Sequence, residues 1–275
     1  MIRYILSGDE KMEFIAKFLP IFFAAVFGLI IGSFLNVCIY RIPQHNFFAK
    51  SRSYCPHCGH TLAAKDLVPL FSFLFLGGKC RYCKERISPQ YPIIESLTSI
   101  LFVCAYLKFG YTVYTPLVWF VVSALIVMSV IDIKTMEIPN GIILYLIIFG
   151  LIAALSGIFA PNWVPYPLKW YEYLIGAFCI SLPFFLIALF TGGIGGGDIK
   201  LLFAMGLFLG WKATVFGAFV GILIGAIVAV IVMIVNKKKK GDPIPFGPSL
   251  AVGLTLAVFF GNELTNAYLS MLGWI

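Results

Sequence analysis

The fold is decided first by residues 18–40, which read FLPIFFAAVFGLIIGSFLNVCIY and contain no charged residue. A helix needs about 20 mostly apolar residues to cross the hydrocarbon core of a bilayer, so this stretch predicts a membrane span. It is too long for the apolar core of a signal peptide, and residues 1–17 mix acidic with basic side chains. We therefore expect a membrane helix here and not a cleavable signal.

Further apolar stretches follow along the chain. Hydrophobic residues make up 61% of it and charged residues 12%, whereas soluble domains average about 45–50% and 25%. The sequence predicts an all-α polytopic membrane protein with about eight transmembrane helices. The later spans are expected near residues 92–107, 109–131, 138–160, 173–191 with a kink at Pro183, 201–211, 213–236 and 249–260.

The basic residues predict the orientation of these spans. If the N-terminus lies outside, 14 of the 20 Lys and Arg residues fall on the inner side, including four lysines at 237–240. Cytoplasmic loops of membrane proteins carry such an excess of basic residues. The net charge of +8 therefore indicates anionic lipid and cytosolic loops, and we expect no nucleic-acid partner.

Two CxxC pairs lie in the polar segment after the first helix, with 21 residues between them: Cys55, Cys58, Cys80 and Cys83. Four thiolates at this spacing suit tetrahedral zinc, and a site with four protein ligands is structural. The predicted orientation puts the pairs in the cytosol, where disulfides are disfavoured. His57 and His60 could replace a ligand but are expected to be bystanders. The alternative interpretation is unmetallated turns or a redox pair.

Two aspartates lie at the edges of predicted spans. Asp132 ends one apolar run, and Asp198 follows three glycines at 195–197. The predicted topology places both at the cytosolic membrane edge, where a carboxylate is costly unless it is paired, hydrated or functional. Two neighbouring carboxylates share a proton, so one can activate water while the other protonates a carbonyl. Alternatively, Asp132 is a solvated helix end paired with Lys134, and the glycines form a hinge.

These motifs resemble those of the GxGD aspartic proteases of the type IV prepilin peptidase family. The similarity covers about residues 18–262, in family order. It includes GSFLNVCIYRIP at 32–43, the CxxC pairs with GKCR at 78–81, and the stretch from Ile87 through Tyr91-Pro92 to Glu95. It continues with Asp132 followed by IPN at 138–140, GGGDIK at 195–200 and PFGP at 245–248.

The resemblance implies a bifunctional enzyme of the bacterial inner membrane. It would cleave the leader of type IV prepilins or pseudopilins after a glycine on the cytosolic side, with Asp132 and Asp198 as catalytic residues. It would then N-methylate the new terminus with S-adenosylmethionine. The implied domains are a first helix at 1–42, a zinc-binding cytosolic domain at 43–91 associated with methyl transfer, and a membrane peptidase domain at 92–275.

Residues for the methyl donor are implied by the same resemblance. Gly78 and Lys79 stand where the family has a Gly-Lys pair tied to methyl transfer, and a buried carboxylate such as Glu95 suits a sulfonium or an amine. Lys79 could equally be a surface charge, and Glu95 could form an ion pair with Arg41 or Arg86.

Two other classes of protein fit parts of the sequence. A proton-coupled transporter also places carboxylates and a glycine break in the membrane, but it does not need a four-cysteine module and no inverted repeat is visible. A zinc-bearing scaffold leaves the paired aspartates unexplained. An enzyme explains both features.

Overall fold

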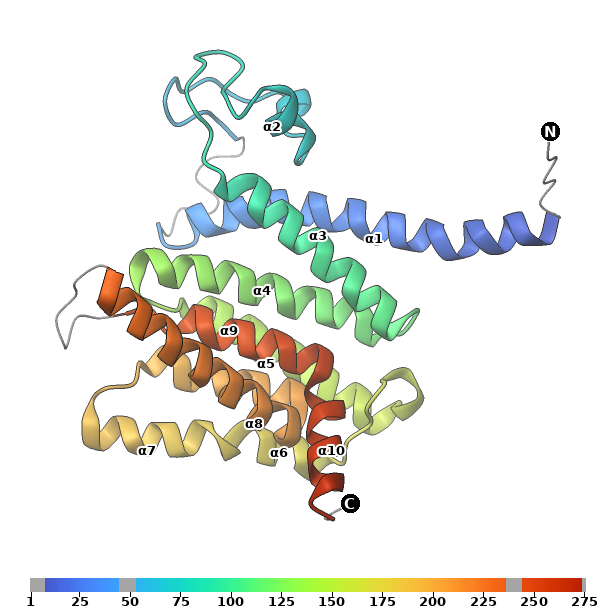
Figure 1. Ribbon diagram of the computed structural model, residues 1–275, viewed down its shortest axis with the longest axis vertical. Coiled ribbons are helices and arrows are strands. Elements are labelled where there is room, and N and C mark those ends of the chain that lie inside the picture. Colours follow the sequence, from blue (N-terminus) through green and yellow to red (C-terminus); the bar gives the residue numbers. More distant parts are fainter. Residues whose placement is uncertain (1–7, 45–52, 236–243, 274–275) are drawn as a thin grey trace. The chain divides into compact units, whose positions relative to one another are not determined.

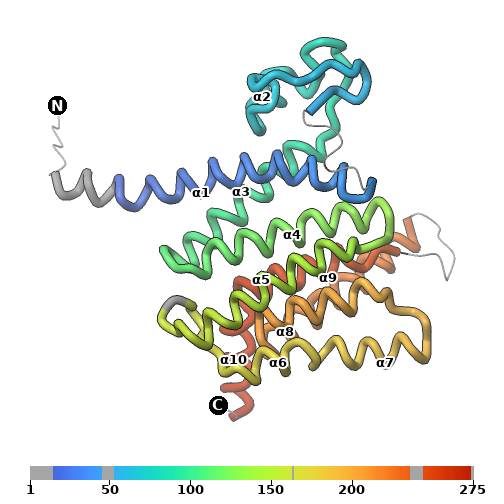
Figure 2. The backbone as a smooth tube through the Cα atoms, turned by 180° about the vertical axis from the view of Figure 1, so that it is seen from behind, coloured from blue at the N-terminus to red at the C-terminus, as the bar shows by residue number. Residues whose placement is uncertain are grey.

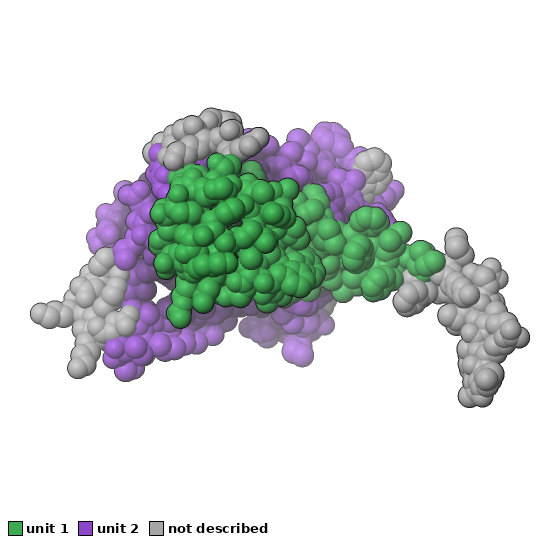
Figure 3. Space-filling view, turned by 90° about the horizontal axis from the view of Figure 1, so that it is seen from above, with its two compact units in different colours: residues 1–38, 46–110 green, residues 39–45, 111–275 purple. Residues whose placement is uncertain are grey.

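The computed structural model describes residues 8–44, 53–235 and 244–273, and the named elements within them are all helices (Figure 1). This confirms the predicted all-α class. The four lysines at 237–240, which weigh most in the predicted orientation, lie outside the described residues. The chain forms two compact units, one of residues 1–38 and 46–110 and the other of residues 39–45 and 111–275 (Figure 3).

The first unit is built on two helices packed through small residues. Helix α1 (Gly8–Arg41) and helix α3 (Gln90–Phe109) meet where Gly28 and Gly32 lie one turn apart on α1. A Cβ atom on either glycine would lie 2.6 Å from the α3 backbone, at Ser99 and Glu95 respectively. Small residues at this spacing let helices approach closely in lipid, where packing replaces the hydrophobic effect as the main attraction.

The cysteine segment of the same unit has little regular structure. It contains a 3-10 turn at Ala64–Asp66 and the short helix α2 (Phe71–Phe75). Leu70, just before α2, has a φ of 62°, so the chain turns sharply there. Local turns and the cysteine cluster therefore define this segment.

The second unit is a bundle of long apolar helices (Figure 2). It contains α4 (Tyr114–Thr135), α5 (Asn140–Phe159), the pair α6 (Trp170–Cys179) and α7 (Ser181–Thr191), and α8 (Gly196–Val235). It ends with α9 (Gly247–Leu256), which continues through a π-helical turn at Ala257–Gly261 into α10 (Asn262–Met271). The break between α6 and α7 falls at Ile180, in the turn before Pro183, whose ring cannot fit against the carbonyl four residues earlier.

Helix α8 is a hairpin of two legs. Its 40 residues would extend about 60 Å, twice the hydrocarbon thickness, but Gly210 interrupts it with φ 72° and ψ 175°. In the first leg, Lys200 binds Asn140, just beyond the end of α4, whereas Phe208 stacks on Tyr114 at the start of α4. The first leg therefore runs antiparallel to α4.

The second leg of α8 returns toward the starting end. A Cβ atom on Gly225 would lie 2.4 Å from the Phe246 ring. Phe246 directly precedes Gly247 of α9, whose backbone N–H donates to Asp132 near the end of α4. Seven helical segments of the described chain are long and apolar enough to span a membrane. When the two legs of α8, which Gly210 separates, are counted one by one, these segments agree with the prediction of about eight.

Candidate active site

Asp132 lies in the last turn of α4, which ends when Met136 adopts a left-handed conformation with a φ of 55°. Its side chain is buried, with 5% of its surface exposed. The Oδ2 atom accepts a hydrogen bond of 3.0 Å from the backbone N–H of Gly247, the first residue of α9. The α9 backbone therefore holds the carboxylate in place from across the bundle.

Asp198 lies in the first turn of α8 and is half-buried. The three preceding glycines have different roles. A Cβ atom on Gly195 would lie 3.0 Å from Oδ2 of Asp198, and one on Gly197 would lie 2.9 Å from the Ile138 side chain. Gly196, in contrast, faces open space. Gly197 thus lets the start of α8 lie close to Ile138, Gly195 leaves room for the Asp198 carboxylate, and Gly196 borders open space.

A cavity of about 310 Å³ brings the two aspartates together. Its lining comes from the end of α4, from residues 136–140 and from the start of α8, and it includes Asp132, Asp198, Glu137 and the three glycines. At its edge, Lys200 Nζ donates to Asn140 Oδ1 at 2.9 Å and ties the two segments together.

The four cysteines of the two CxxC pairs form a single cluster, with all four Sγ atoms within 4.8 Å of one another, so they could hold a metal ion. The Sγ atoms of Cys55 and Cys83 are 3.9 Å apart. The backbone N–H groups of Cys83 and Tyr82 donate to Cys80 and lower the pKa of its thiol to about 7. The sequence spacing thus correctly predicted the juxtaposition.

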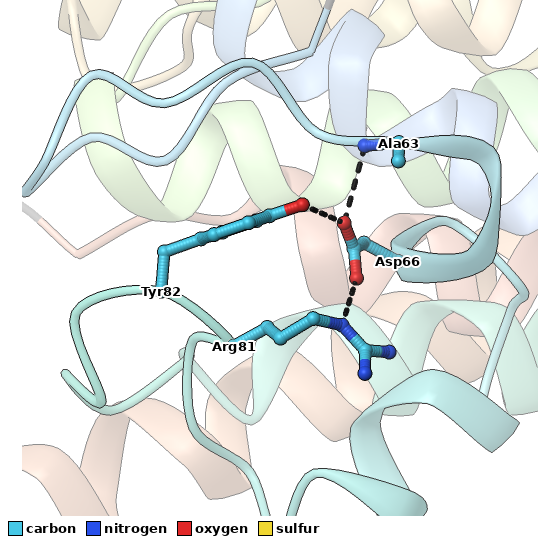
Figure 4. A network of polar contacts seen from close by, with 4 residues as sticks. All are labelled: Ala63, Asp66, Arg81 and Tyr82. Carbon is cyan, nitrogen blue, oxygen red and sulfur yellow. Dashed lines mark hydrogen bonds and ion pairs between the residues drawn. The ribbon is translucent and has the colours of Figure 1, made fainter.

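A polar network holds the two cysteine turns together (Figure 4). Asp66, which follows the first turn, accepts hydrogen bonds from Arg81 Nε at 2.6 Å and from the Tyr82 hydroxyl at 3.0 Å, both in the second turn. The Arg81 hydrogen bond holds the pKa of the Asp66 carboxyl below its usual value. The His60 ring packs against the Tyr82 ring, with centroids 3.7 Å apart. The His60 ring is thus engaged by Tyr82, outside the thiol cluster.

The three residues predicted for methyl transfer lie near the two ends of α2. The buried Glu95 accepts a hydrogen bond of 2.7 Å from the backbone N–H of Leu70, just before α2. Gly78 and Lys79 follow α2; Gly78 has a φ of +69°, and Lys79 is exposed and pairs with Arg86 in an isolated bridge. None of the three lines the cavity that holds the aspartates.

Comparison with known proteins finds a family match for each part of the chain, the one with the cysteine cluster and the one with the two aspartates. Residues 26–109 match the Bacterial Peptidase A24 N-terminal domain, and residues 119–230 match the Type IV leader peptidase family. The chain belongs to the type IV leader peptidase family. The first match includes the cysteine cluster, and the second includes both aspartates, so membership confirms the resemblance seen in the sequence and supports peptidase activity.

Relatives of this leader peptidase family member share most of its length. A Bacillus subtilis (strain 168) protein named "Prepilin leader peptidase/N-methyltransferase" is 39% identical, covering 90% of this chain and 96% of the relative. Proteins with the same name from Pseudomonas aeruginosa and Pectobacterium carotovorum subsp. carotovorum are 34% and 35% identical. They cover 90% and 89% of this chain and 92% and 95% of their own lengths. No solved structure shows significant similarity.

The contacts that hold the site of this family member together were not predicted from its sequence. Gly247 belongs to the PFGP motif, but the motif does not indicate a role for its backbone N–H. Asn140 and Lys200 also stood inside quoted motifs without an assigned partner. The position of the Asn140 and Lys200 motifs next to the two aspartates in the sequence was the signal that could have placed both residues in the site.

Proposed function

We propose that this protein cleaves the leader peptide of type IV prepilins or pseudopilins with Asp132 and Asp198, and then methylates the new N-terminus. The observation that carries the peptidase proposal is one cavity lined by both carboxyl groups and by Gly196, which faces open space. The names of the relatives support both activities.

The proposed hydrolysis needs only the two carboxyl groups and water. One carboxylate takes a proton from water as the oxygen attacks the scissile carbonyl carbon, and the other, protonated carboxyl donates its proton to the carbonyl oxygen. The tetrahedral intermediate then collapses: the first carboxyl group gives the leaving amine the proton taken from water, and the second recovers its proton from a hydroxyl of the intermediate. The open space at Gly196 leaves room for an extended substrate backbone.

Cleavage of a full-length prepilin in proteoliposomes tests the assignment. Asp132→Asn and Asp198→Asn each preserve the size of the side chain but cannot share the proton, so each should abolish cleavage. Glu137→Gln is the matched control, because the exposed Glu137 carboxylate also lines the cavity and should be dispensable. Near-normal turnover by either aspartate variant contradicts the dyad.

We further propose that the metal held by the four cysteines is structural zinc. A tetrahedron with Zn–S bonds of 2.3 Å has sulfur atoms about 3.8 Å apart. The separation of 3.9 Å between the Cys55 and Cys83 sulfurs fits this size. Elemental analysis of the purified chain should find one zinc ion, and a metal-free chain with a protease-resistant cysteine segment contradicts the proposal.

Methyl transfer is proposed to use Gly78, Lys79 and Glu95. S-adenosylmethionine, when bound, supplies the methyl group that the new amine accepts. The Glu95 carboxylate receives one N–H from Leu70 and retains further lone pairs for a cationic group. Lys79→Ala should leave cleavage intact and reduce pilin methylation, read as a loss of about 14 Da by mass spectrometry. Asp198→Asn should methylate a pilin supplied already cleaved, and fully methylated pilin from Lys79→Ala contradicts the assignment.

The remaining proposals concern organisation. The several apolar helices and the family make this an integral membrane protein. We propose that it lies in the bacterial inner membrane with its N-terminus outside and the cysteine segment and aspartates on the cytosolic side. We also propose the functional division into a first helix at residues 1–42, a zinc-binding domain at 43–91 and a membrane peptidase domain at 92–275. Protease protection of tagged chains in inverted vesicles tests this orientation.

A further inference from the structure

Helix α2, together with two residues before the turn that leads into it, carries an exposed apolar face. We call this face the α2 face; it comprises Leu67, Val68, Phe71, Leu74 and Phe75. The most exposed members are Phe75 at 86% and Leu74 at 62%. Phe71, Leu74 and Phe75 are three and four residues apart and so lie on one side of α2, and Leu67 and Val68 precede the turn at Leu70. A soluble module seldom leaves such an apolar cluster uncovered, so the α2 face requires a partner.

The position of the α2 face within its own unit points to lipid. Leu70, in the middle of this segment, donates its backbone N–H to Glu95. Glu95 lies in the second turn of α3, about 7.5 Å inside the start of a helix that is apolar and long enough to span a membrane. The facing residue on α1, Gly32, is also inside a candidate span. The α2 face therefore starts at the depth of the outer turns of two membrane helices.

The charges around the α2 face fit the same location. Lys65 precedes it, Lys79, Lys84 and Arg86 follow it, and all four are exposed. The acidic residues of this segment are Asp66, whose carboxylate is engaged by Arg81 and Tyr82, and the exposed Glu85. Basic residues that flank an apolar aromatic helix are typical of helices that lie in the interface of a membrane with anionic lipids.

We propose that α2 is an interfacial membrane helix whose α2 face is covered by lipid acyl chains, while the flanking basic residues contact anionic headgroups. The buried Glu95 anchors the start of this helix to α3. The cysteine segment, which continues on both sides of α2, is then held at the membrane surface through the hydrogen bond from Leu70 to Glu95. This proposal is independent of the reaction that the protein catalyses.

Photocrosslinking of the full chain in bilayers of phosphatidylethanolamine and phosphatidylglycerol tests the proposal. Phe75→p-benzoylphenylalanine and Leu74→p-benzoylphenylalanine place a group that reacts with nearby C–H bonds on the α2 face. His57→p-benzoylphenylalanine is the control, because His57 is exposed at the tip of the first cysteine turn. A protease-resistance assay on each variant checks that the cysteine segment is folded.

We expect lipid adducts at positions 74 and 75 in excess of those at position 57 by on the order of tenfold, unchanged when prepilin is added. Adducts at position 75 to the prepilin would identify a substrate-docking face and overturn the proposal. Adducts to another peptide of the same chain, or equal lipid labelling at all three positions, would overturn it as well.

Discussion

Replacing Gly247 by alanine tests whether the backbone of α9 positions the proposed catalytic carboxylate. The added Cβ atom would lie 2.7 Å from Oδ2 and 3.1 Å from Cγ of Asp132, both closer than an ordinary contact. The contact would join the backbone of α9 to the buried side chain of Asp132, so the Asp132 carboxylate has to move by several tenths of an ångström. The 3.0 Å hydrogen bond from the Gly247 N–H is then weakened or lost.

The expected loss follows from that hydrogen bond. A hydrogen bond to a charged group contributes about 1.5–3 kcal/mol. If it is lost in the transition state, kcat/KM falls roughly 10- to 150-fold. A displacement of about 1 Å in a catalytic group costs a similar factor. We therefore expect Gly247→Ala to cleave prepilin about 10–150 times more slowly than the wild type, as initial rates in proteoliposomes.

The control is a glycine of the same unit that has room for a methyl group. A Cβ atom on Gly141, in the first turn of α5, meets nothing within 4 Å. Gly141→Ala should therefore keep wild-type rates. If Gly247→Ala also stays within about threefold of the wild type, the N–H of Gly247 does not hold the carboxylate for catalysis.

Three further outcomes are expected. Cys58→Ser should release the metal, seen by elemental analysis, and make the cysteine segment sensitive to protease, because structural zinc contributes about 10–16 kcal/mol to folding. Asp66→Asn should destabilise that segment in chemical denaturation near neutral pH. The pKa of Asp66 is lowered chiefly by Arg81, so its ionised form stabilises the fold above about pH 4. The difference from wild type should disappear as the pH falls below that value. Gly206→Ala should lower the thermal stability of the detergent-solubilised chain, because its Cβ would lie 2.1 Å from the Gly176 carbonyl oxygen; Gly193→Ala, with one contact at 3.6 Å, should not.

Local sequence was sufficient for the parts of this protein that depend on composition and short spacing. Long uncharged runs predicted the helices, and Asp132 and Asp198 were found because both lie at the edges of predicted spans, Asp198 directly after three glycines. The CxxC spacing predicted the thiol cluster, because each pair forms one turn. These features need few contacts between distant residues.

Contacts between distant residues left no comparable signal. The hydrogen bond from Gly247 to Asp132 joins positions 115 residues apart, and no periodicity in the sequence reports it. The break in α8 was predicted at the charge of Lys212, but it falls at Gly210, since a residue without Cβ tolerates the positive φ. The hydrogen bond between Leu70 and Glu95 was likewise not predicted, because its donor is a backbone N–H, which every residue except proline possesses.

The hairpin of α8 gives its first leg an unusual length. From Gly196 to the break at Gly210 it has about 14 residues, or roughly 21 Å, whereas the hydrocarbon core is about 30 Å thick. Hydrophobic mismatch of this size is relieved when the bilayer thins around the short segment. Thinning brings the headgroup region, and with it water, down to the level of Asp198. The length of one leg thus sets how far water must travel into the membrane, and lipids with shorter acyl chains should favour hydrolysis.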